Sequence, residues 1–97
     1  MLGVVLSRRA ERDLRRIGSR DTIIRIREAL TSLAAGDANL DIKLLADASP
    51  WHRLRVGDYR VIYRPVHPDE GADESVEWLV ARIVHRRDLV RAASTLA

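Results

Sequence analysis

The chain has 97 residues, with 17 lysine or arginine residues against 14 aspartate or glutamate residues, a net charge of +3 at neutral pH. This length suits one domain, and a hydrophobic content of 46% is enough for a core of mainly aliphatic side chains. The absence of cysteine excludes a disulfide scaffold, a thiolate nucleophile and a zinc site with sulfur ligands. We therefore expect residues 1–97 to form a single domain, with no signal peptide or membrane helix.

The first third of the chain predicts a short strand followed by two helices. Residues 3–6 form a β-branched run suited to a strand, and Ser7 can cap the helix that follows. A second helix can be capped by Ser19 or Asp21 and ends near Gly36. Apolar residues recur at helical spacing in both: Ala10, Leu14 and Ile17 in the first, and Ile23, Ile26, Leu30 and Leu33 in the second. Because the link between them is short, the two helices should form an antiparallel hairpin.

The middle of the chain predicts a loop and then a β-hairpin. Residues 37–50 mix turn residues with a small apolar cluster, which indicates an ordered loop. Residues 51–56 and 59–64 have strand-like alternation on either side of a Gly57-Asp58 turn.

The last third predicts an exposed loop, a buried strand and a tail. Residues 65–81 contain five acidic residues and no lysine or arginine, and the part around the prolines is typical of an exposed loop. Residues 75–85 form the most apolar strand, while residues 86–97 can form a short helix or a flexible arm. The fold class is therefore α+β: a small antiparallel sheet, made of the N-terminal strand plus a three-stranded C-terminal meander, with the helical hairpin on one face and the other face open.

Alternation along the hairpin separates its side chains into two faces. With a two-residue turn, Arg55 lies directly opposite Arg60, where like charges destabilise a sheet. The face expected under the helices holds His52, Leu54, Val56, Tyr59, Val61 and Tyr63. The opposite face holds Trp51, Arg53, Arg55, Arg60, Ile62 and Arg64. This second face is either an ordinary charged, solvated surface or a nucleic-acid platform with guanidinium groups for phosphates and an indole for base stacking.

Two sequence blocks, LRVGDYRVIY and ARIVHRRDLV, resemble the RelE/ParE superfamily of toxins from bacterial type II toxin–antitoxin systems. The resemblance extends to the opening strand and to the basic helix that begins SRRAERDLRRI. It implies a RelE/ParE-like fold and a toxin that inhibits translation as a ribosome-dependent messenger RNA endoribonuclease. It also implies an alternative, a ParE-like inhibitor of DNA gyrase. A third hypothesis is a nucleic-acid-binding module without catalysis.

The RelE-like reading implies attack of a ribose 2′-hydroxyl on the adjacent phosphate, without a metal or cofactor. The family's basic residues match Arg53, Arg60 and Arg86 in this sequence. We expect Arg60 and Arg86 to stabilise the scissile phosphate, with His85 as the third catalytic candidate. The expected RNA-binding residues are Arg53, Arg55, Arg64, Arg87 and Trp51.

One position departs from the family pattern. Many RelE-like toxins have a catalytic tyrosine at the end of the HRRD block, whereas this chain has Val90. Proton transfer would then depend on His85 or His52, because histidine titrates near neutrality. The alternatives are cleavage by arginines alone or no cleavage at all.

The resemblance also implies partners and a location. A cognate antitoxin protein should cover the basic face or the helical layer, and the targets would be the ribosome and its messenger RNA, or gyrase instead. The expected location is the cytoplasm, with no membrane partner. The three histidines are scattered, so the spacing predicts no metal site.

Overall fold

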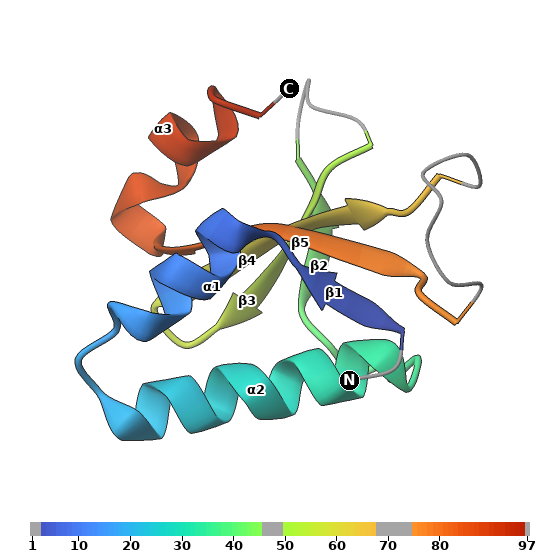
Figure 1. The fold of residues 1–97 in the computed structure, drawn as a ribbon, viewed down its shortest axis with the longest axis horizontal. Helices are drawn as coiled ribbons and strands as arrows, with labels where there is room; N and C mark the ends of the chain where they lie inside the picture. Colours follow the sequence, from blue (N-terminus) through green and yellow to red (C-terminus); the bar gives the residue numbers. More distant parts are fainter. Residues whose placement is uncertain (1–2, 46–49, 68–74, 97) are drawn as a thin grey trace.

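The computed structural model describes residues 3–45, 50–67 and 75–96, which form a five-stranded sheet with helices on both faces (Figure 1). Its elements in chain order are β1 (Val4–Leu6), α1 (Arg8–Arg15), α2 (Arg20–Ala34), β2 (Ile42–Leu44), β3 (His52–Val56), β4 (Tyr59–Pro65), β5 (Trp78–His85), the 3₁₀ helix η2 (Arg86–Asp88) and α3 (Leu89–Ala93). The α+β class is confirmed. The predicted exposed loop falls largely on residues 68–74, which lie outside the described residues.

The helical hairpin forms as its caps and apolar stripes predict. The Ser7 hydroxyl accepts a hydrogen bond from the Ala10 N–H at 3.0 Å, and the Ser19 hydroxyl accepts one from the Thr22 N–H at 3.3 Å. Gly36 follows the second helix with φ of 75°, a left-handed conformation that glycine adopts without strain. The buried helical residues are Ala10, Leu14, Ile26, Leu30 and Leu33, with Ile17 just after α1.

The sheet order is β1-β5-β4-β3-β2, and two features of it differ from the prediction. The meander of β3, β4 and β5 is antiparallel as expected, but β1 pairs with β5 in parallel, so the sheet is mixed. No tight turn links these two strands, and so nothing local fixes their relative direction. The second difference is β2, which lies within the stretch predicted as a loop and pairs antiparallel with β3.

A bulge in β5 fixes how the helical layer meets the sheet. Ile62 pairs with Arg82 whereas Tyr63 pairs with Val80, so the register shifts by one residue at this point. Asp13 of α1 is directed at the bulge: its Oδ2 accepts from the Ile83 N–H at 3.0 Å and from Arg82 Nε at 2.8 Å. Both charged side chains are largely buried, and their ion pair holds α1 against β5.

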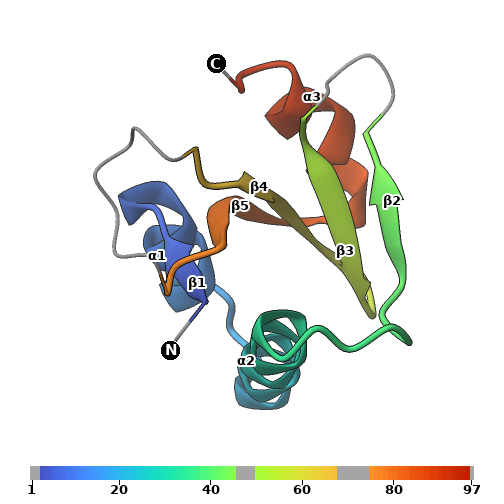
Figure 2. The ribbon, with the colours of Figure 1, turned by 90° about the vertical axis from the view of Figure 1, so that its right-hand side faces the viewer.

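The two faces of the sheet carry two separate cores. The main core lies under α1 and α2 and includes Leu54, Val61, Tyr63, Val80 and Ile83 from the strands. The second core is made of Trp51, Ile62, Val84 and Ala92. Figure 2 shows α2 on one side of the sheet and α3 on the other.

The prediction that one sheet face stays open is therefore wrong. The C-terminal segment, residues 86–96, folds back over that face as η2 and α3. Its apolar side chains are the reason, because Leu89, Ala92 and Leu96 recur at helical spacing and pack on the second core. Within the described residues, no helix is long and apolar enough to cross a membrane.

Candidate nucleic-acid interface

The turn between β3 and β4 brings together the cations that the sequence predicted. Gly57 has φ of 58°, the left-handed conformation that a tight hairpin turn requires. The strands pair in the predicted register, and Arg55 lies directly opposite Arg60. The predicted facing of two arginines is confirmed, and its cost must be offset by surrounding groups or by a bound anion.

Four arginines gather at this end of the hairpin. We call them the arginine cluster: Arg53, Arg55, Arg60 and Arg86. Arg60 is partly buried, and its Nη1 donates to the carbonyls of Gly57 and Tyr59, both at 3.0 Å. Burial lowers the pKa of Arg60 below its ordinary value, and the positive charges of the other three members lower it further. Because arginine stays protonated at neutral pH, the cluster is a concentrated positive site.

Asp41 is an acidic neighbour of the cluster that sequence reasoning missed. Its Oδ1 accepts from Arg53 Nη1 at 3.0 Å, and its Oδ2 lies 3.9 Å from Arg55 Nη1. The hydrogen bond from Arg53 lowers the pKa of Asp41 below its ordinary value of 3.8. Asp41 directly precedes β2, and the pairing of β2 with β3 places its carboxylate beside Arg53 and Arg55. Because the sequence did not predict β2, it did not predict this contact either.

Arg86 is held at the turn by the residue that follows Gly57. The Arg86 N–H donates to the Asp58 carbonyl at 2.7 Å, and Arg86 Nε lies 3.7 Å from Asp58 Oδ1. Both side chains are about two-thirds exposed, so this ion pair is weak and can be exchanged for a ligand.

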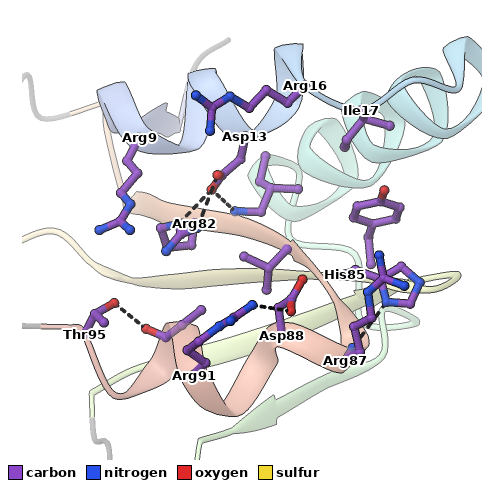
Figure 3. Close-up of a pocket in the computed structure, with 14 residues that line it drawn as sticks. Arg9, Asp13, Arg16, Ile17, Arg82, His85, Arg87, Asp88, Arg91 and Thr95 are labelled. Carbon is purple, nitrogen blue, oxygen red and sulfur yellow. Dashed lines mark hydrogen bonds and ion pairs between the residues drawn. The ribbon is translucent and has the colours of Figure 1, made fainter.

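His85 lies on the opposite face of the sheet from Arg60. It pairs with Tyr59, and the two rings meet edge-on with centroids 5.6 Å apart. Its Nδ1 accepts from the Arg87 N–H at 3.3 Å, so the neutral ring carries its proton on Nε2. His85 is therefore placed to donate a hydrogen bond rather than to remove a proton. Arg87 lines a cavity beside α1 (Figure 3), and none of the four cluster members lines it.

Trp51 and Arg64 lie at the far end of the hairpin from the turn. Trp51 is 8% exposed and belongs to the second core. The Arg64 guanidinium lies 5.6 Å from the centroid of the indole, and its Nη1 donates to the Pro65 carbonyl at 2.9 Å. The indole face is thus covered by protein, and the structure does not bring this pair together with the arginine cluster.

Comparison with known families shows to which family the chain belongs. The family model described as the ParE toxin of type II toxin–antitoxin systems matches residues 4–90, nearly the whole chain. The chain belongs to this toxin family. The RelE/ParE resemblance seen in the sequence is confirmed.

A solved structure supports the toxin fold independently. The chain is similar to a chain of the RelB-RelE antitoxin-toxin complex from Methanococcus jannaschii, with a TM-score of 0.66 and 21% identity over 91% of this toxin and 96% of that chain. At this identity the likeness concerns the fold. A search of the curated proteins finds no match.

The toxin's tyrosines do not replace the missing family tyrosine at the cluster. Val90 is 84% exposed on α3. Tyr63 is buried in the main core, and burial raises the pKa of Tyr63 to about 12. Tyr59 is partly buried on the same sheet face as His85. In the described part of the chain, no group of three or more histidine, aspartate or glutamate side chains is arranged to hold a metal ion.

Proposed function

We propose that this toxin is a metal-independent, ribosome-dependent messenger RNA endoribonuclease. The observation that supports this function is the arginine cluster, in which the positive charges of Arg53, Arg55 and Arg86 add to burial in lowering the pKa of Arg60 at a solvent-accessible turn. Such mutual repulsion is relieved when an anion binds between the cations. An RNA backbone supplies anions at regular spacing, which suits several arginines held on adjacent strands.

The chemistry assigned to the site is attack of a ribose 2′-hydroxyl on the neighbouring phosphorus. The P–O5′ bond breaks, leaving a 2′,3′-cyclic phosphate and a 5′-hydroxyl. Arg60 would contact the phosphate oxygens, since its position is fixed by two backbone carbonyls. Arg86 would exchange Asp58 for the developing negative charge. With His85 facing away, the proton of the 2′-hydroxyl would pass to water or to a group of the ribosome, which would also protonate the 5′-oxygen, while the arginines stay protonated and stabilise the negative charge.

The other predicted RNA-binding residues would contribute to RNA binding to different degrees. Arg55 is more than half exposed and would grip the RNA strand, whereas Arg53 is held by Asp41 and would contribute charge. Arg64 and Trp51 would support the hairpin from its far end. Base stacking on Trp51 would require the C-terminal segment to leave the second core.

The direct test adds purified toxin to translating ribosomes and maps RNA ends by primer extension. We expect cuts in the ribosomal A site, with 2′,3′-cyclic phosphate at the upstream end and no effect of EDTA beyond its effect on the ribosome. Arg60→Ala should abolish the cuts, while Arg20→Ala, an exposed arginine at the start of α2, should retain them. Intact message in the presence of folded toxin would contradict the proposal.

A second candidate function is inhibition of DNA gyrase, as the name of the matched family suggests. One geometric observation favours it: His85 and both tyrosines lie on the sheet face opposite the arginine cluster. The same toxin preparation should then be assayed with gyrase and relaxed plasmid. Blocked supercoiling or trapped cleaved DNA, together with intact message, would establish the gyrase function instead.

As a type II toxin, the protein would act in the cytoplasm and would be neutralised by a cognate antitoxin protein. The similar RelE chain was solved in a complex with the antitoxin RelB, which supports this kind of partner. The exposed members of the arginine cluster would attract acidic residues of such a partner.

A further inference from the structure

A cavity of about 510 Å³ lies between α1 and the C-terminal segment (Figure 3), and its lining includes no member of the arginine cluster. Arg9 on α1 and Arg16, which directly follows α1, lie at one side, while Arg87 and Arg91 come from the C-terminal segment at the other. Five arginines and two aspartates line it, so its walls carry a net positive charge. A cavity of this volume accommodates one nucleotide.

The two acidic groups in the wall are already engaged. Asp13 binds Arg82 and the Ile83 N–H, and Asp88 binds Arg91 at 2.7 Å. Arg9, Arg16 and Arg87 have no side-chain hydrogen bond or ion pair with the other described residues. Three guanidinium groups therefore remain to bind an anion within the cavity.

Neutral donors add to these charges at the inner end of the cavity. Among the described residues, no strand pairs with the edge of β5 beyond its pairing with β1, and the Ile83 N–H points from this edge to Asp13. Because an antiparallel ladder alternates, the His85 N–H points to the same edge. The side chains of His85 and Tyr59 belong to residues that line the same cavity.

We propose that this cavity is a second anion site that binds the phosphate of a nucleotide. Arg9, Arg16 and Arg87 would contact the phosphate oxygens. The His85 N–H at the edge of β5 would be an additional donor from the backbone. The nucleotide can come from the strand that the arginine cluster binds or from a free mononucleotide. The site does not depend on the proposed RNA cleavage, because it shares no residue with the arginine cluster.

The test follows backbone amide resonances of the full-length toxin by NMR during titration at constant ionic strength. The probes are 5′-AMP, inorganic phosphate and a six-nucleotide single-stranded RNA. We expect shifts of the Ile83, His85 and Arg87 amides. If 5′-AMP by itself saturates the shifts, the source is a free nucleotide. If the amides shift only with the RNA, the source is the strand. Either result supports the site.

Variants separate this site from the arginine cluster. Arg16→Ala and Arg87→Ala should each raise the dissociation constant of 5′-AMP about tenfold, because each removes a charge-assisted hydrogen bond. Arg12→Ala, an exposed arginine on the same helix that does not line the cavity, should leave this constant within about twofold, as should Arg60→Ala. The two sites are thus distinguishable, since Arg60→Ala should abolish RNA cleavage while nucleotide binding persists.

Three results would overturn the proposal. The first is no shift of the three amides with any probe. The second is equal weakening by Arg12→Ala and Arg16→Ala, which would indicate diffuse attraction to a basic surface. The third is displacement by a short Asp/Glu peptide at a lower concentration than that of 5′-AMP required for saturation, which would assign the cavity to an acidic protein segment.

Discussion

The two ends of the β3–β4 hairpin carry the same alternation of arginines but place them in different surroundings. At the turn, Arg60 is surrounded by like charges, and the nearby carboxylates of Asp41 and Asp58 are exposed. At the far end, Arg64 lies over Trp51, which is packed into the second core beneath the C-terminal segment. The turn end therefore has an excess of positive charge, with four arginines beside two carboxylates, whereas the far end uses an arginine to cover apolar surface.

This difference shows that strand alternation determines which face a side chain occupies but not what covers that face. The arginines at both ends lie on the face that alternation assigned to them. Their surroundings come from distant segments: Asp41 before β2 at the turn, and the C-terminal segment at the far end. In the proposed function, the same residue type is therefore a binding group at the turn and a structural group at the far end.

The largest expected effect is on stability, at the far end. Trp51→Ala should reduce the free energy of unfolding by about 3–5 kcal/mol, because it removes the largest side chain of the second core. Urea denaturation measures this change. The control is Val90→Ala on exposed α3, which should change stability by less than about 0.5 kcal/mol. A loss below about 1 kcal/mol for Trp51→Ala would mean that the second core does not hold the segment in place.

His85 provides the next test, because its ring lies on the sheet face opposite Arg60. Asparagine can accept the Arg87 N–H in place of Nδ1, so His85→Asn should keep the fold of η2. We expect the single-turnover cleavage rate to fall less than about tenfold, below the range typical of a general acid or base. A hundredfold loss of this rate in a folded variant would show that His85 takes part in proton transfer.

A smaller effect is expected when the carboxylate beside the cluster is removed. Asp41→Asn should tighten RNA binding about two- to fivefold at low salt, because Arg53 and Arg55 lose a competing anion. Fluorescence anisotropy with a labelled RNA measures the change, and it should shrink as salt is raised. Weaker binding would show that Asp41 orients the arginines rather than competing for them.

The smallest effect concerns the pH dependence of stability at the same ion pair. The hydrogen bond from Arg53 lowers the pKa of Asp41 in the folded state below its ordinary value of 3.8. The pair therefore contributes stability above pH 3.8, and this contribution is lost as pH falls through the lower pKa of the folded state. The difference in urea midpoint between wild type and Asp41→Asn should be constant from pH 7 to about 5 and shrink below 3.8. If the difference in urea midpoint grew as the pH fell, this would contradict the lowered pKa of Asp41 in the folded state.

Local sequence patterns were sufficient for the elements whose partners are close in the chain. The stripe that ends with Leu30 and Leu33 predicts α2, and the Gly57-Asp58 turn predicts the register of β3 with β4. These features depend on spacing within one or two turns of helix or across one tight turn. The family resemblance rests on the same hairpin and on the end of β5, and it is confirmed for the fold.

Long-range pairing accounts for what the sequence did not predict. Strand β2 has only three residues, and it exists because β3 supplies its hydrogen-bonding partner. The direction of β1 and the fold-back of the C-terminal segment likewise depend on contacts with β5 and the second core. In the candidate site, the facing of Arg55 and Arg60 was predictable, whereas the contact with Asp41 and the burial of Trp51 were not.

The measurement that tests the central claim most directly compares Arg60→Ala with Arg64→Ala in single-turnover cleavage of message on the ribosome. Both arginines are partly buried on β4 and lie on the same face, so they form a matched pair. Arg60→Ala should lower the rate at least about 100-fold, as expected for loss of a group that stabilises transition-state charge, while Arg64→Ala should lower it less than about threefold. Equal losses for two folded variants would contradict the division of the hairpin into a binding end and a structural end.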